Sequence, residues 1–232
     1  MEGEEPNSIR GVIWQNLVRL SNRIALACER SGRLVSEVRL IAITKNFPSS
    51  WIRAAYRCGL HNFGENRVKE TRLKYAELTD IRHDMQLNLV GHLQSNKARD
   101  AVELFDIIQS VDSIKLAGII NERAGRPVSI MLQVNAAGEM TKYGFSHDEV
   151  GRALEEIYKM PMIQVIGLMT IAPIAGDPEV VRPVFSNLRK IKESFGLQEL
   201  SMGMTDDFEV AIEEGSTAIR IGRAIFGERR IQ

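Results

Sequence analysis

The sequence predicts a single-domain (β/α)8 TIM barrel, and three observations favour this fold class. Short apolar runs alternate with amphipathic stretches along almost the whole chain, a pattern typical of βα units around a parallel sheet. Eight such runs fall within about 200 residues, at the compact end of the range for such a barrel. No Pro-, Gly- or Ser-rich linker divides the 232 residues, so we expect one domain over 1–232.

The first predicted element is an amphipathic helix over about 8–31 that packs on the barrel. Apolar side chains recur at intervals of three or four along one face of this stretch, and they are Ile9, Ile13, Leu17, Leu20, Ile24 and Cys28. Gly32 follows, and a glycine is a common residue at a helix end. The apolar face therefore predicts a partner surface on the rest of the domain.

Eight strand candidates follow, each a short apolar run bounded by polar or turn-forming residues. They are 39–44, 60–63, 86–90, 105–110, 129–134, 164–169, 199–202 and 217–221. Helix signals lie between them, such as Ser49 and Ser50 before one helix and Asp206 and Asp207 at the start of another. An open doubly wound sheet is the competing fold, but it is less favoured because no GxGxxG motif follows the first strand.

Charge and composition exclude several functional classes. Thirty Lys and Arg balance thirty Asp and Glu, so the chain lacks the electrostatic footprint of a general nucleic-acid or anionic-membrane binder. Cys28 and Cys58 form no CxxC pair and the four histidines lack ligand spacing, so no metal site is expected. No apolar run is long enough for a membrane span, and the N-terminus lacks signal-peptide features. We expect a cytoplasmic protein.

Lys45 is the first candidate for chemistry. The carboxyl ends of barrel strands form the active face of the fold, and Lys45 comes directly after the apolar run of the first strand. Partial desolvation at a barrel mouth lowers the pKa of a lysine amine and raises its neutral, nucleophilic fraction. Such an amine forms an imine with an aldehyde. Taken alone, a lysine at a strand end is more often a solvated side chain.

The last two strands end in residues that suit a phosphate group. The seventh strand carries Ser201, and the eighth runs through Arg220 to Gly222 and Arg223, at the barrel position where phosphates commonly bind. Gly222 allows an anion to approach the backbone, where the N–H groups of Gly222 and Arg223 would face its oxygens. The residues alone leave open that the glycines only end strands and that Arg220 forms a surface ion pair.

Six longer segments together resemble one known family. They are IAITKNFP (41–48), HNFGENRVKE (61–70), LVGHLQSNKAR (89–99), QVNAAGEMTKYGF (133–145), GLMTI (167–171) and LSMGMTDDFEVAIEEGSTAIRIGRAIFG (200–227). In order, and over nearly the whole chain, they resemble the pyridoxal phosphate homeostasis protein family, also called the YggS or PROSC family. The resemblance implies a fold-type III barrel like the N-terminal domain of alanine racemase, which holds pyridoxal 5'-phosphate (PLP) as an internal aldimine on Lys45.

The resemblance also implies roles for individual residues. Arg220 matches the arginine beside the pyridine nitrogen of PLP. Ser201, Gly222 and Arg223 match phosphate-binding positions, the last two through their backbone N–H groups.

Four further positions lie in the same motifs. Asn66 and Met169 match pocket-lining positions, and Thr205 stands where the family often has Ser. Lys142, in the loop after the fifth strand, is a candidate second amine that passes PLP between sites by imine exchange. A solvated loop lysine is the alternative interpretation of Lys142.

The arginine partner predicts which chemistry the bound cofactor supports. A guanidinium only donates hydrogen bonds, so Arg220 leaves the ring nitrogen unprotonated and weakens the electron sink. The racemases that the chain resembles add a second domain, and their dimer partner supplies a tyrosine base, whereas this sequence ends at Gln232, ten residues after Gly222. Among the tyrosines, only Tyr143 is expected near the barrel mouth.

We therefore expect a PLP carrier that buffers or delivers the cofactor in the cell without robust catalysis. Its expected partners are PLP and PLP-dependent apoenzymes, and its expected state is a monomer or weak dimer. Two alternatives remain open at this point. One is a PLP-dependent amino-acid racemase or related lyase, and the other is a cofactor-free, aldolase-like barrel with Lys45 as its imine lysine.

Overall fold

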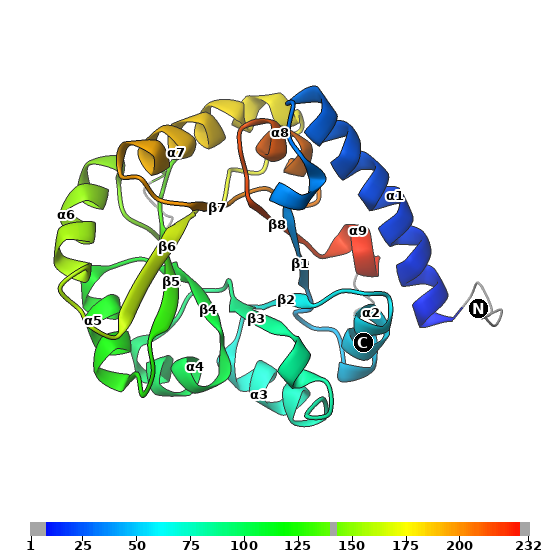
Figure 1. Cartoon of the computed structure of the whole chain (residues 1–232), viewed down its shortest axis with the longest axis horizontal. Helices are drawn as coiled ribbons and strands as arrows, with labels where there is room; N and C mark the ends of the chain where they lie inside the picture. The colour runs from blue at the N-terminus through cyan, green and yellow to red at the C-terminus, as the bar shows by residue number, and fades with distance from the viewer. Residues whose placement is uncertain (1–7, 140–142, 228–232) are drawn as a thin grey trace.

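The computed structural model describes residues 8–139 and 143–227. Within these ranges, eight parallel strands form a closed barrel in the order β1 to β8, and helices surround it (Figure 1). The strands are β1 Arg39–Ile43, β2 Asn62–Glu65, β3 Gln86–Leu89, β4 Ile107–Val111, β5 Val128–Gln133, β6 Ile163–Met169, β7 Glu199–Ser201 and β8 Ala218–Ile221. The predicted (β/α)8 barrel is confirmed.

The helices follow the strands in alternation. They are α1 Ile9–Arg30, α2 Ser49–Arg57, α3 Val68–Ala76, α4 Ala98–Leu104, α5 Ile114–Arg123, α6 His147–Ile157, α7 Arg182–Ser194, α8 Phe208–Glu213 and α9 Arg223–Phe226. Short 3-10 turns lie at η1 Val35–Glu37, η2 Arg82–Asp84, η3 Ser95–Lys97 and η4 Pro178–Val181.

The predicted first helix is confirmed, except that Ile9, which was predicted on its apolar face, is exposed. The Ser8 hydroxyl accepts a hydrogen bond of 3.0 Å from the backbone N–H of Gly11, and Gly32 leaves the helix at φ 66°. The apolar stripe of α1 packs mainly on α2, α8 and α9. It therefore covers the helices that flank the junction of β8 and β1, where the barrel closes.

Several predicted boundaries differ from the structure, most of them by one residue, and the fourth strand begins at Ile107, two residues later than expected. The second strand begins at Asn62, two residues later than expected, because the N–H of Leu60 still donates to Ala55 O of the preceding helix at 3.2 Å. Ser49 lies inside α2, with Pro48 at the N-cap, and its hydroxyl donates to Glu77 instead of capping the helix.

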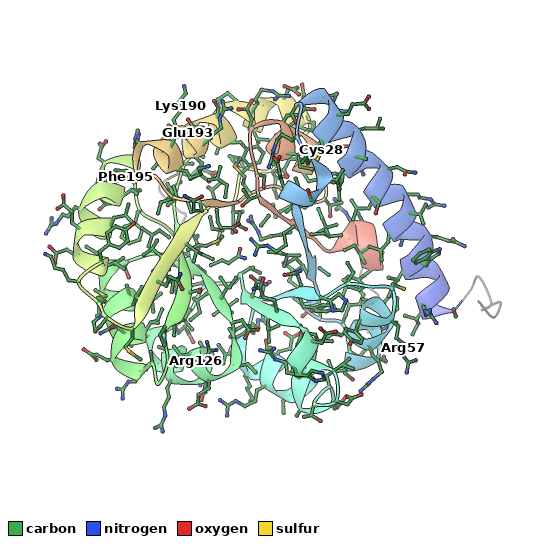
Figure 2. All side chains as sticks on the ribbon, in the orientation of Figure 1. Cys28, Arg57, Arg126, Lys190, Glu193 and Phe195 are labelled. Carbon is green, nitrogen blue, oxygen red and sulfur yellow. The ribbon has the colours of Figure 1, made fainter. Side chains whose placement is uncertain are left out.

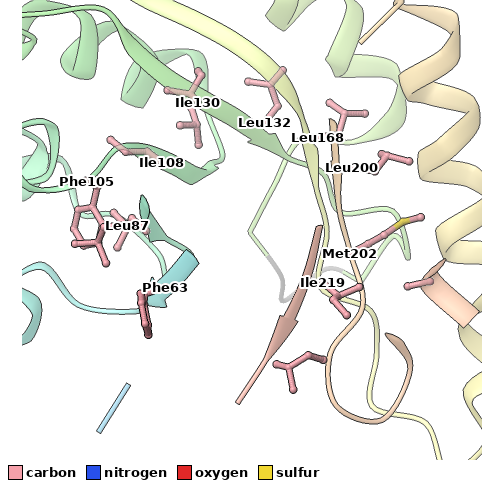
Figure 3. Close-up of a cluster of buried hydrophobic side chains, with 14 of the residues drawn as sticks. Phe63, Leu87, Phe105, Ile108, Ile130, Leu132, Leu168, Leu200, Met202 and Ile219 are labelled. Carbon is pink, nitrogen blue, oxygen red and sulfur yellow. The ribbon is translucent and has the colours of Figure 1, made fainter. Parts of the chain in front are cut away.

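The strands send alternate side chains outward and inward. Outward-facing residues form the main apolar core between strands and helices, as Figure 3 shows for Leu87, Ile108, Leu200 and Ile219. Charged residues such as Arg57, Arg126 and Lys190 lie on the outer rim (Figure 2). This arrangement leaves the inward positions of the strands free to carry polar groups.

The described residues contain neither a membrane-spanning helix nor a metal-binding cluster. None of the helices combines the length and apolar content of a membrane span. No group of three or more His, Cys, Asp or Glu side chains in the same ranges is arranged to hold a metal ion.

Candidate functional site

A cavity of about 670 Å³ opens at the carboxyl ends of β1, β2 and β8. Its polar lining consists of Lys45, Asn66, Thr205, Asp206, Arg220 and Arg223, with Gly222 beside them. Five of the seven predicted cofactor-binding residues therefore meet in one pocket, which has the size of a typical small-molecule site. The other two, Met169 and Ser201, are fully buried beneath it.

A second hollow, of about 760 Å³, lies on the outer face beside α1, η4 and α8. Ion pairs occupy its charged side chains: Arg30 with Glu213, Arg182 with both Glu179 and Glu213, and Glu209 with Arg23 outside the hollow. None of the predicted site residues lines it. We therefore place the functional site in the barrel mouth.

Lys45 is presented by a turn at the end of β1. The strand ends at Ile43, Thr44 is fully buried, and Lys45 is half-buried in the wall of the cavity. Asn46 follows with φ 64°, and in the described ranges it is the one non-glycine residue with positive φ. Asparagine tolerates this left-handed conformation, which turns the chain away from the strand direction directly after Lys45.

Arg220 is held rigidly inside the barrel. It is 5% exposed, its Nη1 donates to Ser201 Oγ at 2.7 Å, and its Nη2 donates to Thr170 O at 2.7 Å. Burial lowers the pKa of Arg220 to about 10, against the opposing charge of Asp207. The guanidinium therefore remains a cation at neutral pH, so it only donates hydrogen bonds.

A directed chain of hydrogen bonds continues from Arg220 across the barrel interior. Ser201 Oγ accepts from Arg220 and donates to Gln109 Oε1 at 2.7 Å. Gln109 Nε2 donates to Asn88 Oδ1 at 2.8 Å, and Asn88 Nδ2 donates to Phe63 O at 3.2 Å. Because Arg220 only donates, it fixes the direction of every later bond. Ser201 thus supports Arg220 in this structure, whereas the sequence predicts it as a phosphate ligand.

Ser201→Ala is expected to lower the free energy of unfolding by about 1–3 kcal/mol, because it leaves buried groups of Arg220 and Gln109 unpaired. Urea denaturation checks this value. Ser186→Ala, on the outer helix α7, is the matched control, with an expected change within about 0.5 kcal/mol. Equal effects of the two substitutions would contradict the supporting role of Ser201.

Hydrogen-bond donors lie free at the β8 end of the cavity. Within the described part of the chain, no hydrogen bond uses the backbone N–H of Gly222 or Arg223. A Cβ added at Gly222 would lie 3.3 Å from Ile43 O, so only glycine leaves this approach open without a shift. The Arg223 side chain forms an ion pair of 2.5 Å with Asp206 at the cavity rim.

An unsatisfied acceptor lies on the β2 side of the cavity. Asn66 Oδ1 is buried, and no described residue donates a hydrogen bond to it. The backbone of Asn66 packs against Gly91, where an added Cβ would lie 2.3 Å from Asn66 O. Gly91 is therefore required for the position of Asn66 at the site.

The sequence matches the family described as alanine racemase, N-terminal domain, over residues 16–230. The chain is 40% identical over 225 residues to the pyridoxal phosphate homeostasis protein of Aquifex aeolicus, covering 93% of this chain and 98% of that protein. The Pseudomonas aeruginosa protein of the same name is 37% identical over 222 residues, with coverage of 94% and 96%. The chain belongs to the pyridoxal phosphate homeostasis protein family.

Solved structures agree with this family. A protein of Bifidobacterium adolescentis matches with a TM-score of 0.90 and 37% identity, covering 97% of this chain and 98% of that chain. PipY of Synechococcus elongatus, solved with PLP bound, matches with a TM-score of 0.81 and 37% identity, covering 93% and 100%. Alanine racemase of Corynebacterium glutamicum, at 16% identity and a TM-score of 0.70, covers 95% of this chain and 62% of the racemase and shows the fold alone.

Thr205 and Asp206 are polar residues that line the cavity although the sequence does not predict them as ligand-binding residues. Thr205 lies in the loop between β7 and α8, where its side chain reaches the mouth, whereas Ser201 lies within β7 and faces the interior. The sequence does contain a signal for Thr205, because this threonine keeps a hydroxyl group at a position where the family often has Ser.

The remaining predicted positions lie at the edge of the site or beyond it. Lys142 lies outside the described residues. Tyr143 is 60% exposed and stacks on His92 with ring centroids 4.1 Å apart, and neither lines the cavity. His92 Nδ1 lies 3.1 Å from Asp112 Oδ2.

Proposed function

We propose that the protein holds PLP covalently on Lys45 and acts in PLP homeostasis, as a carrier without robust catalysis of its own. One observation carries this proposal: the half-buried Lys45 side chain and the free N–H groups of Gly222 and Arg223 face a single cavity. The names of its relatives support the homeostasis role, and PipY is a relative solved with PLP bound.

The residues of the cavity fit the functional groups of PLP. An amine suits the aldehyde, and a permanent cation such as Arg220 suits an unprotonated ring nitrogen. The buried Asn66 Oδ1, which lacks a donor among the described residues, suits a ligand hydroxyl or protonated imine nitrogen. The N–H groups of Gly222 and Arg223 suit phosphate oxygens.

Each residue then has a distinct role in capture. PLP supplies an aldehyde that an amine traps reversibly. Lys45 provides the amine, and the partly closed pocket restricts the water around it. Arg220 keeps its protons and lines the cavity, and Ser201 and Thr170 hold its guanidinium in place. Thr205, Gly222 and Arg223 anchor the phosphate, so the ligand stays in place when the covalent bond opens.

Borohydride reduction of the PLP-loaded protein tests the proposal. Reduction fixes the carbon–nitrogen bond, so a mass measurement on the digested protein identifies the modified lysine. We expect the pyridoxyl group on the peptide that contains Lys45. A label elsewhere, or no label, would contradict the proposed function.

Thr205→Val is expected to weaken the binding of pyridoxine 5'-phosphate about 10- to 100-fold, which is the effect of losing one hydrogen bond to a charged group. Valine keeps the shape of the side chain and removes only the hydroxyl. Calorimetry measures the dissociation constant, with Thr79→Val in an exposed loop as the control. Capture of unphosphorylated pyridoxal should be unchanged, and an equal loss for both ligands would exclude a phosphate contact.

Asp206→Asn is expected to slow PLP release about two- to fivefold, the range for an exposed ion pair. The Asp206 carboxylate pairs with Arg223 at the rim and lines the cavity, where its negative charge would repel the phosphate group. Release is measured by trapping free PLP, with Asp148→Asn on α6 as the control. Faster release from Asp206→Asn would show that the ion pair supports the bound phosphate instead.

We also propose PLP-dependent apoenzymes as recipients, a cytoplasmic location and a monomeric or weakly dimeric state. An exchange amine at Lys142 remains part of this proposal, and transfer of PLP to an apoenzyme by Lys142→Ala tests it. An unchanged transfer rate would reject a role for Lys142.

A further inference from the structure

A buried charged cluster lies behind Lys45. It consists of Thr44 directly after β1, Glu65 at the end of β2, and Glu70 and Lys74 on α3, and we call it the Lys74 cluster. Lys74 Nζ lies 2.6 Å from Glu65 Oε1 and 3.0 Å from Glu70 Oε1, while Thr44 Oγ1 donates to Glu65 Oε1 at 2.7 Å. None of these residues lines the cavity, so the proposed function gives them no role.

The cluster fixes the backbone on both sides of Lys45. On one side, Lys74 Nζ donates to Thr44 O at 2.8 Å. On the other side, Glu70 Oε1 accepts a hydrogen bond of 2.7 Å from the backbone N–H of Asn46, the residue held at φ 64°. A lysine side chain is flexible, so the direction of its first bonds depends on this clamped turn.

Stability alone is a poor explanation for the cluster. Glu65 is 0% exposed, and the Lys74 side chain is 11% exposed. Burial raises the pKa of Glu65, and the charge of Lys74 opposes that shift. Glu65 Oε2 is also buried without a hydrogen-bond partner among the described residues. A buried ion pair contributes little net stability even when all its polar atoms have hydrogen-bond partners. In this pair, Glu65 Oε2 has none among the described residues.

We propose that Lys74 is a positioning residue, which holds the turn from Thr44 to Asn46 so that the Lys45 amine enters the cavity in line with the aldehyde of the ligand. This inference rests on the proposed function. In the capture step, the neutral amine adds to the aldehyde carbon, and a carbon–nitrogen double bond replaces the carbon–oxygen double bond. The aldehyde oxygen leaves with both amine protons as one water molecule. A misplacement of about 1 Å slows such a step by up to about 100-fold.

The test compares covalent capture with binding of a ligand that cannot be captured. PLP has an aldehyde, whereas pyridoxine 5'-phosphate has an alcohol at the same position and the same ring and phosphate. For Lys74→Met, we expect the rate of PLP capture by the apoprotein to fall about 10- to 100-fold. The dissociation constant of pyridoxine 5'-phosphate should stay within twofold of wild type. Lys69→Met is the matched control, since it removes the same charge from the exposed face of the same helix.

Glu70→Ala keeps the test decisive if Lys74→Met fails to fold. It releases the N–H of Asn46 but leaves the buried pair of Lys74 and Glu65 intact, and we expect about a tenfold slower capture. Capture rates within twofold of Lys69→Met in the folded variants would overturn the inference, and so would an equal loss for both ligands. Absence of capture by the wild-type protein would instead reject the proposed function.

Discussion

Lys45→Ala is expected to abolish covalent retention of PLP and the absorbance band of the bound cofactor. Lys45 lines the cavity and is half-buried, so its removal takes away the proposed amine without opening the apolar core. The phosphate anchors and Arg220 remain, so weak reversible binding should persist. We expect retention of PLP to fall at least about 100-fold, which corresponds to about 2.7 kcal/mol. Equilibrium dialysis and absorbance spectra measure the two effects.

The matched control for this substitution is Lys115→Ala, at an exposed position on α5. It removes the same group far from the predicted anchors and should leave the spectrum unchanged. Binding of pyridoxine 5'-phosphate to Lys45→Ala should stay close to wild type, because that ligand forms no covalent bond. A Lys45→Ala protein that keeps the cofactor band would place the reacting amine on another lysine.

The barrel could be predicted from the sequence because its strands are short, regular and buried by helices. Runs such as 86–90 and 217–221 mark strands by composition alone, and the structure places β3 and β8 within them. The first helix was equally clear, because its apolar stripe and the residues at its ends mark the same stretch of the sequence. The start of α2 was less clear. Ser49 was expected to precede the helix, but its hydroxyl donates to Glu77 and Pro48 takes the N-cap position.

The site was predicted only in part, because strand ends identify some of its residues and not others. Lys45, Arg220 and Gly222 follow from strand ends and meet in the cavity. Ser201 and Thr205 could not be separated in this way, because β7 has only three residues and gives the two-residue alternation too little length to show which hydroxyl faces inward.

The supporting contacts could not be predicted at all. Gln109 and Ser201 are 92 positions apart in sequence, and their hydrogen bond depends on the closed barrel. The contact of Lys74 with Thr44 joins α3 to the end of β1, which belongs to the preceding βα unit and lies 30 positions away. Sequence periodicity describes neighbours within one element, so contacts between distant elements require the three-dimensional structure.

Arg220→Glu is expected to change the electronic state of bound PLP and to lower the stability of the protein. A carboxyl group shares a proton with the ring nitrogen, whereas a guanidinium only donates, so the variant should have a shifted absorbance band and a stronger electron sink. The new carboxylate would also face Thr170 O, which now accepts from Arg220 at 2.7 Å. Leaving a charge uncompensated at this depth costs about 3–5 kcal/mol of unfolding free energy.

Two measurements separate these effects. Spectra and Cα hydrogen exchange of single L-amino acids in deuterated water report on the cofactor, and urea denaturation reports on stability. Arg220→Lys is the control, since it keeps the positive charge and should keep the wild-type band while it loses some of the fixed contacts to Ser201 and Thr170. We expect little exchange in the wild type and faster exchange in Arg220→Glu. An unaltered spectrum in folded Arg220→Glu would exclude Arg220 as the ring partner, and sustained exchange by the wild type at ordinary turnover rates would favour a racemase or lyase over a carrier.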